Sequence, residues 1–170
     1  PFNLKNWGQE QLQEDPRWQY GLPPAGNANF AWIEHMIYHL APGGKIGLVL
    51  ANGALSTQTG GEGEIRKRII EADLVEGIVA MPTQLFYSVT IPVTLWFISH
   101  GKKQKGKTLF IDARNMGHMV DRKHRDLSEQ DIERLASTFE KFQKGKLQDA
   151  KGFCAVVETA DIAKQDYILT

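Results

Sequence analysis

Positive charge is concentrated in one stretch of a chain that is neutral as a whole. The sequence has 20 Lys and Arg against 20 Asp and Glu. Residues 101–125 nevertheless contain eight basic and two acidic side chains, which gives this stretch a net charge of +6. Such a cluster can bind the phosphate backbone of a nucleic acid, although lysines at a hairpin tip also stay in solvent and protect sheet edges. We predict a solvated tip for Lys102–Lys107, whereas both interpretations stay open for the residues after the next strand: Arg114, Arg122, Lys123 and Arg125.

Other groupings of reactive side chains are sparse. His35 and His39 would share a helix face, but no third metal ligand has suitable spacing. Cys154 is the single cysteine, so it cannot form an internal disulfide, and its apolar neighbours predict a buried thiol rather than a nucleophile. The glycine-rich segment 60–63 precedes a helix, but Glu62 would repel a phosphate there, which favours a connecting loop. The sequence contains neither a P-loop nor a G-x-G-x-x-G motif.

The spacing of apolar residues predicts alternating helices and strands. Apolar side chains that recur every three to four residues predict helices at 28–40, 64–72 and 128–143, with a short helical turn near 160–164. Short apolar runs rich in β-branched and aromatic residues predict strands at 45–50, 74–80, 91–99, 108–112 and 153–157. This order is typical of an α/β fold.

The connections between these elements add detail to the predicted fold. Strands 91–99 and 108–112 are separated by a short Gly/Lys turn, which predicts that they pair as an antiparallel hairpin at the end of the sheet. Asn27 or Asn29 is expected to cap the first long helix, and Ser128 with Asp131 forms a variant capping box for the third. Residues 1–27 read as a Pro- and Gly-rich loop whose aromatic content favours a functional role.

Composition excludes several classes of protein. A length of 170 residues with 42% apolar side chains fits one globular domain. No apolar run approaches the ~20 residues that cross a membrane. The first residues have neither the basic nor the apolar region of a signal peptide, and the cysteine content fits a reducing, cytoplasmic setting.

A series of short motifs, in order along nearly the whole chain, resembles one known family. The series is Pro1–Asn3, Gly26–Ile33, His39–Gly44, Leu50–Ser56, Glu64–Arg66, Leu85–Tyr87, Ile91–Val93, Phe110–Arg114 and Leu127–Ser128. It resembles the modification (M) subunit of type I restriction-modification systems, whose members are adenine-N6 DNA methyltransferases that use S-adenosylmethionine. The resemblance implies the C-terminal half of a Rossmann-like S-adenosylmethionine-dependent methyltransferase sheet ending in an antiparallel hairpin.

The resemblance also implies the chemistry of the site. The family's catalytic motif is Asn-Pro-Pro-Phe, and Pro1 and Phe2 match its second half. The Asn, the first Pro and the turn that binds the methyl donor would lie upstream of the chain. Phe2 would stack on an adenine that has left the duplex, while the Asn side chain and a Pro carbonyl accept hydrogen bonds from its amino group. This reaction needs no metal.

Further site residues follow from the same resemblance. Phe86 or Tyr87 is expected to complete the target-base pocket, and Asn52 is expected at the edge of the cofactor site, although ordinary loop packing stays an alternative for each. Residues 1–150 would form the target-base part of the catalytic domain, and 151–170 an extension toward a subunit contact. DNA, a specificity subunit and often a restriction subunit are the partners that the resemblance implies.

Two other functions stay open at this point. The same fold and a similar motif serve methyltransferases that act on RNA or on protein glutamine. Alternatively, the chain is a non-catalytic remnant that docks a subunit through its third helix, 128–143, and its C-terminal tail. We expect the chain alone to be inactive in methylation, because the matching catalytic Asn and donor-binding turn are not among its residues. An unpaired edge of such a half-sheet would also favour association.

Overall fold

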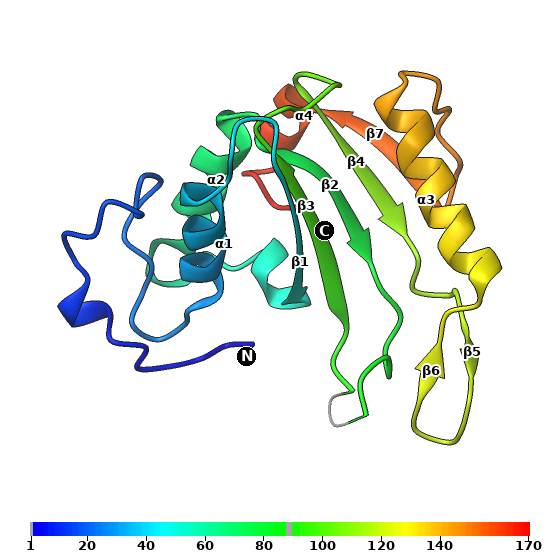
Figure 1. The fold of residues 1–170 in the computed structure, drawn as a ribbon, viewed down its shortest axis with the longest axis horizontal. Helices are drawn as coiled ribbons and strands as arrows, with labels where there is room; N and C mark the ends of the chain where they lie inside the picture. Colours follow the sequence, from blue (N-terminus) through cyan, green and yellow to red (C-terminus); the bar gives the residue numbers. More distant parts are fainter. Residues whose placement is uncertain (1, 88–89) are drawn as a thin grey trace.

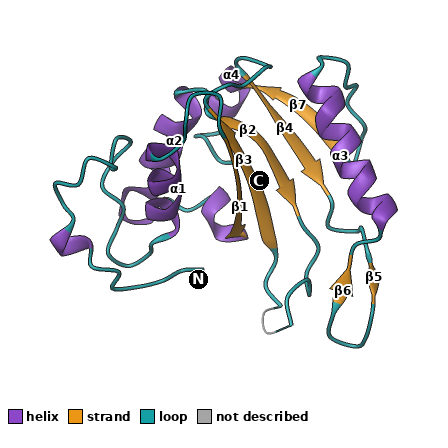
Figure 2. Cartoon of the chain, viewed as in Figure 1, coloured by secondary structure: helices purple, strands orange, loops and turns teal. Residues whose placement is uncertain are grey.

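A five-stranded mixed sheet forms the centre of the computed structural model, which describes residues 2–87 and 90–170 (Figures 1 and 2). The strand order is β1-β3-β2-β4-β7. The strands are β1 Lys45–Ala51, β2 Val75–Ala80, β3 Val93–Ser99, β4 Lys107–Asp112 and β7 Cys154–Glu158. A separate two-stranded hairpin is made of β5 His118–Met119 and β6 Arg125–Asp126.

The helices lie on both faces of this sheet. They are α1 Asn29–Tyr38, α2 Glu62–Glu71, α3 Glu129–Gln143 and α4 Thr159–Ala163, with 3-10 turns η1 Gln9–Gln11, η2 Asn52–Leu55 and η3 Thr59–Gly61. Every helix and strand predicted from the sequence is present, with bounds shifted by no more than two residues, so the α/β prediction is confirmed. Across the described residues, we find no helix with the length and apolar character needed for a membrane span.

The predicted pairing of strands 91–99 and 108–112 is wrong. β3 lies between β1 and β2 and runs antiparallel to both, whereas β4 pairs in parallel with β2 and antiparallel with β7. β3 and β4 are both largely buried, and central strands use the hydrogen-bonding groups on both edges. The connection between them therefore crosses the start of β2. The consecutive strands that do pair antiparallel are β2 with β3 and β5 with β6.

An ion pair between a buried lysine and a partly exposed aspartate stabilises this connection. The Nζ atom of Lys102 lies 2.5 Å from Oδ1 of Asp73, which also accepts a hydrogen bond from the Gly106 backbone N–H. Only 3% of Lys102 is exposed, so this lysine is not part of a solvated tip as the sequence predicted. Charge density alone could not reveal this, because the partner carboxylate is 29 residues away in the chain.

Two apolar cores lie on opposite faces of the sheet. Trp96 of β3 packs edge-to-face against Phe30 of α1, with ring centroids 6.4 Å apart, in the core that α1, α2 and α4 cover. Phe97, one residue on, faces the other way and meets Phe139 of α3, with ring centroids 4.9 Å apart. The alternation along β3 thus sorts large side chains between the two layers.

The N-cap of α3 agrees with the sequence prediction, whereas the N-cap of α1 differs from it. Ser128 accepts a hydrogen bond from the Asp131 N–H and the Asp131 carboxylate bonds back, so the predicted capping box of α3 is confirmed. Ala28, not Asn27 or Asn29, is the N-cap of α1. Asn27 instead accepts from the Asn29 N–H, and the Asn29 side chain bonds to Asn3.

The last twenty residues are built into the same sheet. β7 pairs with β4, and Leu169 is buried in the core under α1 and α2. The buried Arg66 donates from Nε to the Tyr167 carbonyl oxygen at 2.7 Å and so ties this tail to α2. The predicted role of residues 151–170 in a subunit contact stays a prediction.

We expect the ion pair between Lys102 and Asp73 to stabilise the fold. Lys102→Ala leaves Asp73 without its cation and should lower the free energy of unfolding by roughly 2 kcal/mol, as measured by urea denaturation. Lys103→Ala changes an exposed lysine in the same turn and should shift it by less than about 0.5 kcal/mol. Equal effects of the two substitutions would show that the pair contributes nothing.

We also expect a pH dependence from the buried Glu34 on α1. Its side chain is fully buried and accepts one hydrogen bond, from the Tyr20 N–H, and burial raises the pKa of this carboxyl to about 7. Because the folded-state pKa lies above the unfolded value of roughly 4.3, this group makes the fold less stable as pH rises between the two values. Because Glu34→Gln removes this pH dependence, it should raise the free energy of unfolding relative to wild type by roughly 3–4 kcal/mol more at pH 8 than at pH 4. The same change in stability between pH 4 and pH 8 in wild type and in Glu34→Gln would contradict the assignment.

Candidate active site

β1, β2 and β4 end on the same side of the sheet. This side, at the carboxyl ends of the three strands, is called the carboxyl edge below. β3 is antiparallel to β1 and β2, and β4 is parallel to β2, so the first, second and fourth strands all run in the same direction. Figure 1 shows that the first described residues, the described parts of the connection after β2 and the β5–β6 hairpin all lie toward this edge. Open α/β sheets bind their ligands at the edge where the parallel strands end.

Two of the predicted aromatic residues meet at this edge. The rings of Phe2 and Phe86 pack edge-to-face, with centroids 6.3 Å apart and planes at 71°. Phe2 is half-buried against the core under α3, and Phe86 is 39% exposed. The two residues come from segments 84 positions apart in the sequence, and together they give an apolar surface that a planar base can contact. Pro1 lies outside the described residues.

Tyr87 makes a different contact from its neighbour. Its ring stacks on His124 of the β5–β6 connection, with centroids 4.0 Å apart and planes at 11°, although 85% of the residue is exposed. The Arg125 backbone N–H donates to the Gln84 carbonyl oxygen at 2.8 Å, which joins the same loop and hairpin a second time. The hairpin therefore braces the loop that carries Phe86.

The four basic residues predicted to contact a nucleic-acid backbone differ in their surroundings. Arg114 makes a two-pronged ion pair with Asp112, at 2.6 and 2.8 Å, and this contact lowers the pKa of the carboxyl below its ordinary value. The Arg125 guanidinium donates to the carbonyl oxygens of Met116 and Gly117 and so supports the hairpin. The exposed pair in the β5–β6 connection is Arg122 and Lys123.

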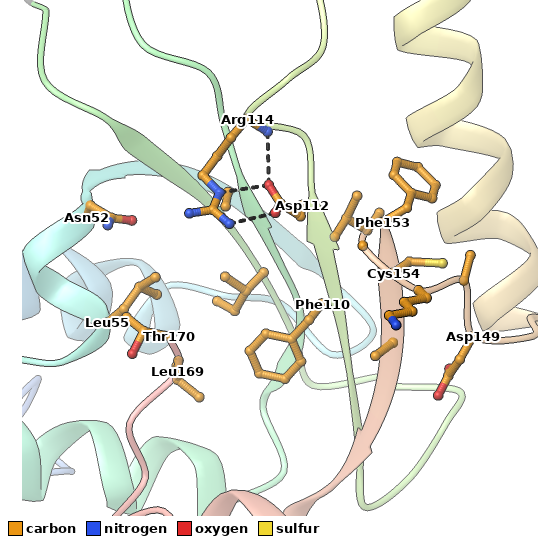
Figure 3. A pocket seen from close by; sticks show the side chains of 17 residues that line it. Asn52, Leu55, Phe110, Asp112, Arg114, Asp149, Phe153, Cys154, Leu169 and Thr170 are labelled. Atoms are coloured by element: carbon orange, nitrogen blue, oxygen red, sulfur yellow. Dashed lines mark hydrogen bonds and ion pairs between the residues drawn. The ribbon is translucent and has the colours of Figure 1, made fainter.

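Asn52 stands at one end of a cavity of about 650 Å³. Figure 3 shows Asn52 and the Asp112–Arg114 pair at this end, with Phe110 and Leu169 at the other. The backbone N–H of Asn52 donates to the Pro92 carbonyl oxygen, which fixes the residue at the end of β1. In residues 2–87 and 90–170 no hydrogen-bond partner is found for its half-buried carboxamide, which is free to bond a ligand there.

The two histidines of α1 are engaged with other groups. Their rings lie 4.5 Å apart, but Nδ1 of His35 lies 2.9 Å from an Arg17 nitrogen and Nδ1 of His39 lies 2.8 Å from the His35 carbonyl oxygen. Burial, the nearby His39 and Arg17 lower the pKa of His35. Within the described part of the chain, no cluster of three or more His, Cys, Asp or Glu side chains could hold a metal ion.

Sequence reasoning missed the residues that support the aromatic pair. Asn3 and Asn29 hold the segment that carries Phe2, and Gln84 and His124 hold the loop that carries Phe86. Asn3 and Asn29 are 26 residues apart, so no local spacing points to their contact. The two asparagines at positions 27 and 29, close to the start of α1, were the sequence feature that could have indicated this contact. They were interpreted only as candidates for the helix cap.

The whole chain, residues 1–170, matches the family model described as N-6 DNA Methylase. The chain belongs to this family. It is 53% identical over 170 residues to the type I restriction enzyme HindI methylase subunit of Haemophilus influenzae, a match that covers 99% of this chain and 38% of that protein. The chain spans about a third of the length of the curated relatives it matches.

Solved structures show the same fold. The type I restriction-modification system methyltransferase subunit from Streptococcus thermophilus superposes with a TM-score of 0.88 at 24% identity, over 99% of this chain and 35% of that one. A putative class I S-adenosylmethionine-dependent methyltransferase from Listeria monocytogenes superposes with a TM-score of 0.57 at 15% identity, over 82% of this chain and 40% of that one. These matches confirm the predicted Rossmann-like methyltransferase fold.

Proposed function

We propose that this chain is the target-base part of a type I restriction-modification methylase subunit, which transfers a methyl group to adenine N6 in DNA. The observation that carries this proposal is the packing of Phe2 on Phe86 at the sheet edge where the parallel strands end. Family membership and the 53% identity to a type I methylase subunit support it. The function belongs to the assembled protein, and residues 1–170 alone should be inactive.

In this proposal the aromatic pair holds the base. An adenine taken out of the duplex stacks on the ring of Phe2, and the edge of Phe86 limits how far the base can move. Stacking of a base on an aromatic side chain contributes roughly 1–3 kcal/mol. Tyr87 keeps the loop in place through its stack on His124 and does not contact the base.

One residue of this chain, Asn52, would contact the methyl donor. S-adenosylmethionine supplies an electrophilic methyl group when it is bound. The free carboxamide of Asn52 at the end of β1 fits a hydrogen bond to the edge of such a cofactor. One carboxamide does not make a binding site, so most of the cofactor contacts would come from residues outside this chain.

The exposed basic pair would contact the DNA backbone. Arg122 and Lys123 extend from the same edge of the sheet as the aromatic pair, and phosphate contacts from such side chains position a duplex without reading its sequence. Arg114 can contact the DNA backbone only if its ion pair with Asp112 is replaced by a contact with a phosphate. A specificity subunit, and in the complete system a restriction subunit, would supply the remaining contacts in the cytoplasm.

A methylation assay tests the proposed function. The gene product that carries residues 1–170, purified with the subunits that accompany it, should convert adenine in DNA to N6-methyladenine, as measured by mass spectrometry of the nucleosides. RNA and protein glutamine substrates in parallel reactions should gain no methyl group. Methylation of either one instead of DNA, or a complex that forms without any methylation, would contradict the proposal.

The two neighbouring aromatics should differ in their effect on this activity. Phe86→Ala removes the ring that limits the movement of the base on Phe2 and should lower kcat about tenfold, because the base is then less well positioned for methyl transfer. Tyr87→Ala changes an equally large side chain in the same loop and should lower kcat by less than about threefold. A loss from Tyr87→Ala that exceeds the loss from Phe86→Ala would contradict the assignment of Phe86 to the base pocket.

The hairpin should account for part of the salt dependence of DNA binding. The double variant Arg122→Ala/Lys123→Ala should reduce the slope of log Kd against log salt by about 1.8, because each phosphate contact contributes about 0.9. The matched control, Lys103→Ala/Lys105→Ala, removes the same charge at the opposite edge of the sheet. Equal slopes for both double variants would show that the hairpin makes no specific contact with DNA.

A further inference from the structure

A reciprocal pair of hydrogen bonds joins Asn29 to the residue that follows Phe2. Oδ1 of Asn29 accepts from the Asn3 backbone N–H at 3.0 Å, and Nδ2 of Asn29 donates to Oδ1 of Asn3 at 2.9 Å. The next residue is held as well, because the Ala28 N–H donates to the Leu4 carbonyl oxygen at 2.9 Å. The start of α1 thus fixes the backbone on the C-terminal side of Phe2.

Burial and backbone conformation make this contact specific. Asn29 is 2% exposed, so an unpaired amide there would carry a desolvation penalty. Asn3 has a φ of +55°, in the left-handed region that asparagine tolerates better than most residues. Asn27 adds a bond of 3.2 Å to the same Asn3 side-chain oxygen.

The Asn29 side chain is not needed to start its own helix. Ala28 is the N-cap of α1, and the Asn29 N–H is satisfied by Oδ1 of Asn27 at 2.9 Å. Both polar atoms of the Asn29 carboxamide therefore bond to residue 3, which directly follows Phe2. A side chain with only a helix-capping role would not make this pair of bonds.

We propose that Asn29 is a positioning residue that orients Phe2 against Phe86 for the target base. The proposal rests on the proposed function and extends it to a residue that contacts neither base nor methyl donor. Loss of the amide pair would let the backbone at residue 3 rotate and would move the Phe2 ring from its place beside Phe86. Misplacement of a group by about 1 Å can cost on the order of 100-fold in rate.

The test compares Asn29→Ala with Glu34→Gln, which changes a buried polar residue of the same helix that makes no contact with residue 3. In the complete methylase, Asn29→Ala should lower kcat at least tenfold and leave the KM for S-adenosylmethionine within twofold of wild type. Glu34→Gln should leave kcat unchanged at the same pH. Wild-type kcat in the Asn29→Ala variant would overturn the proposal.

Asn29→Asp separates positioning from simple loss of structure. The carboxylate keeps the acceptor for the Asn3 N–H but repels Oδ1 of Asn3, whereas the protonated acid can donate to that oxygen. Because position 29 is buried, the pKa of a carboxyl placed there should lie well above its ordinary value, and protonation should begin above pH 5.5. The kcat of this variant, divided by that of wild type at the same pH, should therefore rise at least fivefold between pH 8 and pH 5.5. A ratio that does not change with pH would overturn the proposal, even if Asn29→Ala fails to fold.

Hydrogen exchange at the Asn3 amide gives a measurement that does not depend on methylation. Asn29→Ala should speed exchange of this amide at least tenfold while the amides of β2 and β3 keep their protection. Unchanged exchange at Asn3 would overturn the positioning role. If the wild-type protein exchanges as expected but methylates no adenine, the proposed function fails while the amide pair stands.

Discussion

The insertion of β3 between β1 and β2 is the constraint on which the site depends. β3 must run against both neighbours, so the chain leaves β2 at the carboxyl edge and has to return there before β3 begins. The connection that carries Phe86 is therefore fixed at the edge where β1 and β4 also end. If β3 paired with β4 in a hairpin instead, the strand order would not fix the connection between β2 and β3 beside Phe2.

Contacts between loops then set the position of each aromatic residue. Phe2 is held by amide bonds from the start of α1, and Phe86 by a loop that the hairpin braces through Gln84 and His124. The hairpin that braces this loop also presents Arg122 and Lys123. A phosphate contact and a base contact would thus be made by two segments that are hydrogen-bonded to each other.

Local sequence patterns predicted the helices and strands well, but they predicted poorly which strands pair and which distant residues are in contact. The capping box at Ser128 and the five strands of the main sheet follow from properties of adjacent residues, and these predictions are confirmed, whereas the two short strands β5 and β6 were not predicted. The pairing of β3 and the burial of Lys102 depend on residues tens of positions away, such as Asp73, and these were predicted wrongly. The resemblance brought Phe2 and Phe86 forward as site residues, but the Asn3–Asn29 pair has no local signature and became visible only in three dimensions.

The central claim is that the surface made by Phe2 and Phe86 holds the target base. Photocrosslinking tests it most directly, with 5-iodouracil in place of the target adenine in a duplex bound by the complete methylase. Mass spectrometry of the crosslinked peptides should place the adduct on Phe2 or Phe86. An adduct on Tyr87, or on a residue away from the carboxyl edge of the sheet, would contradict the claim.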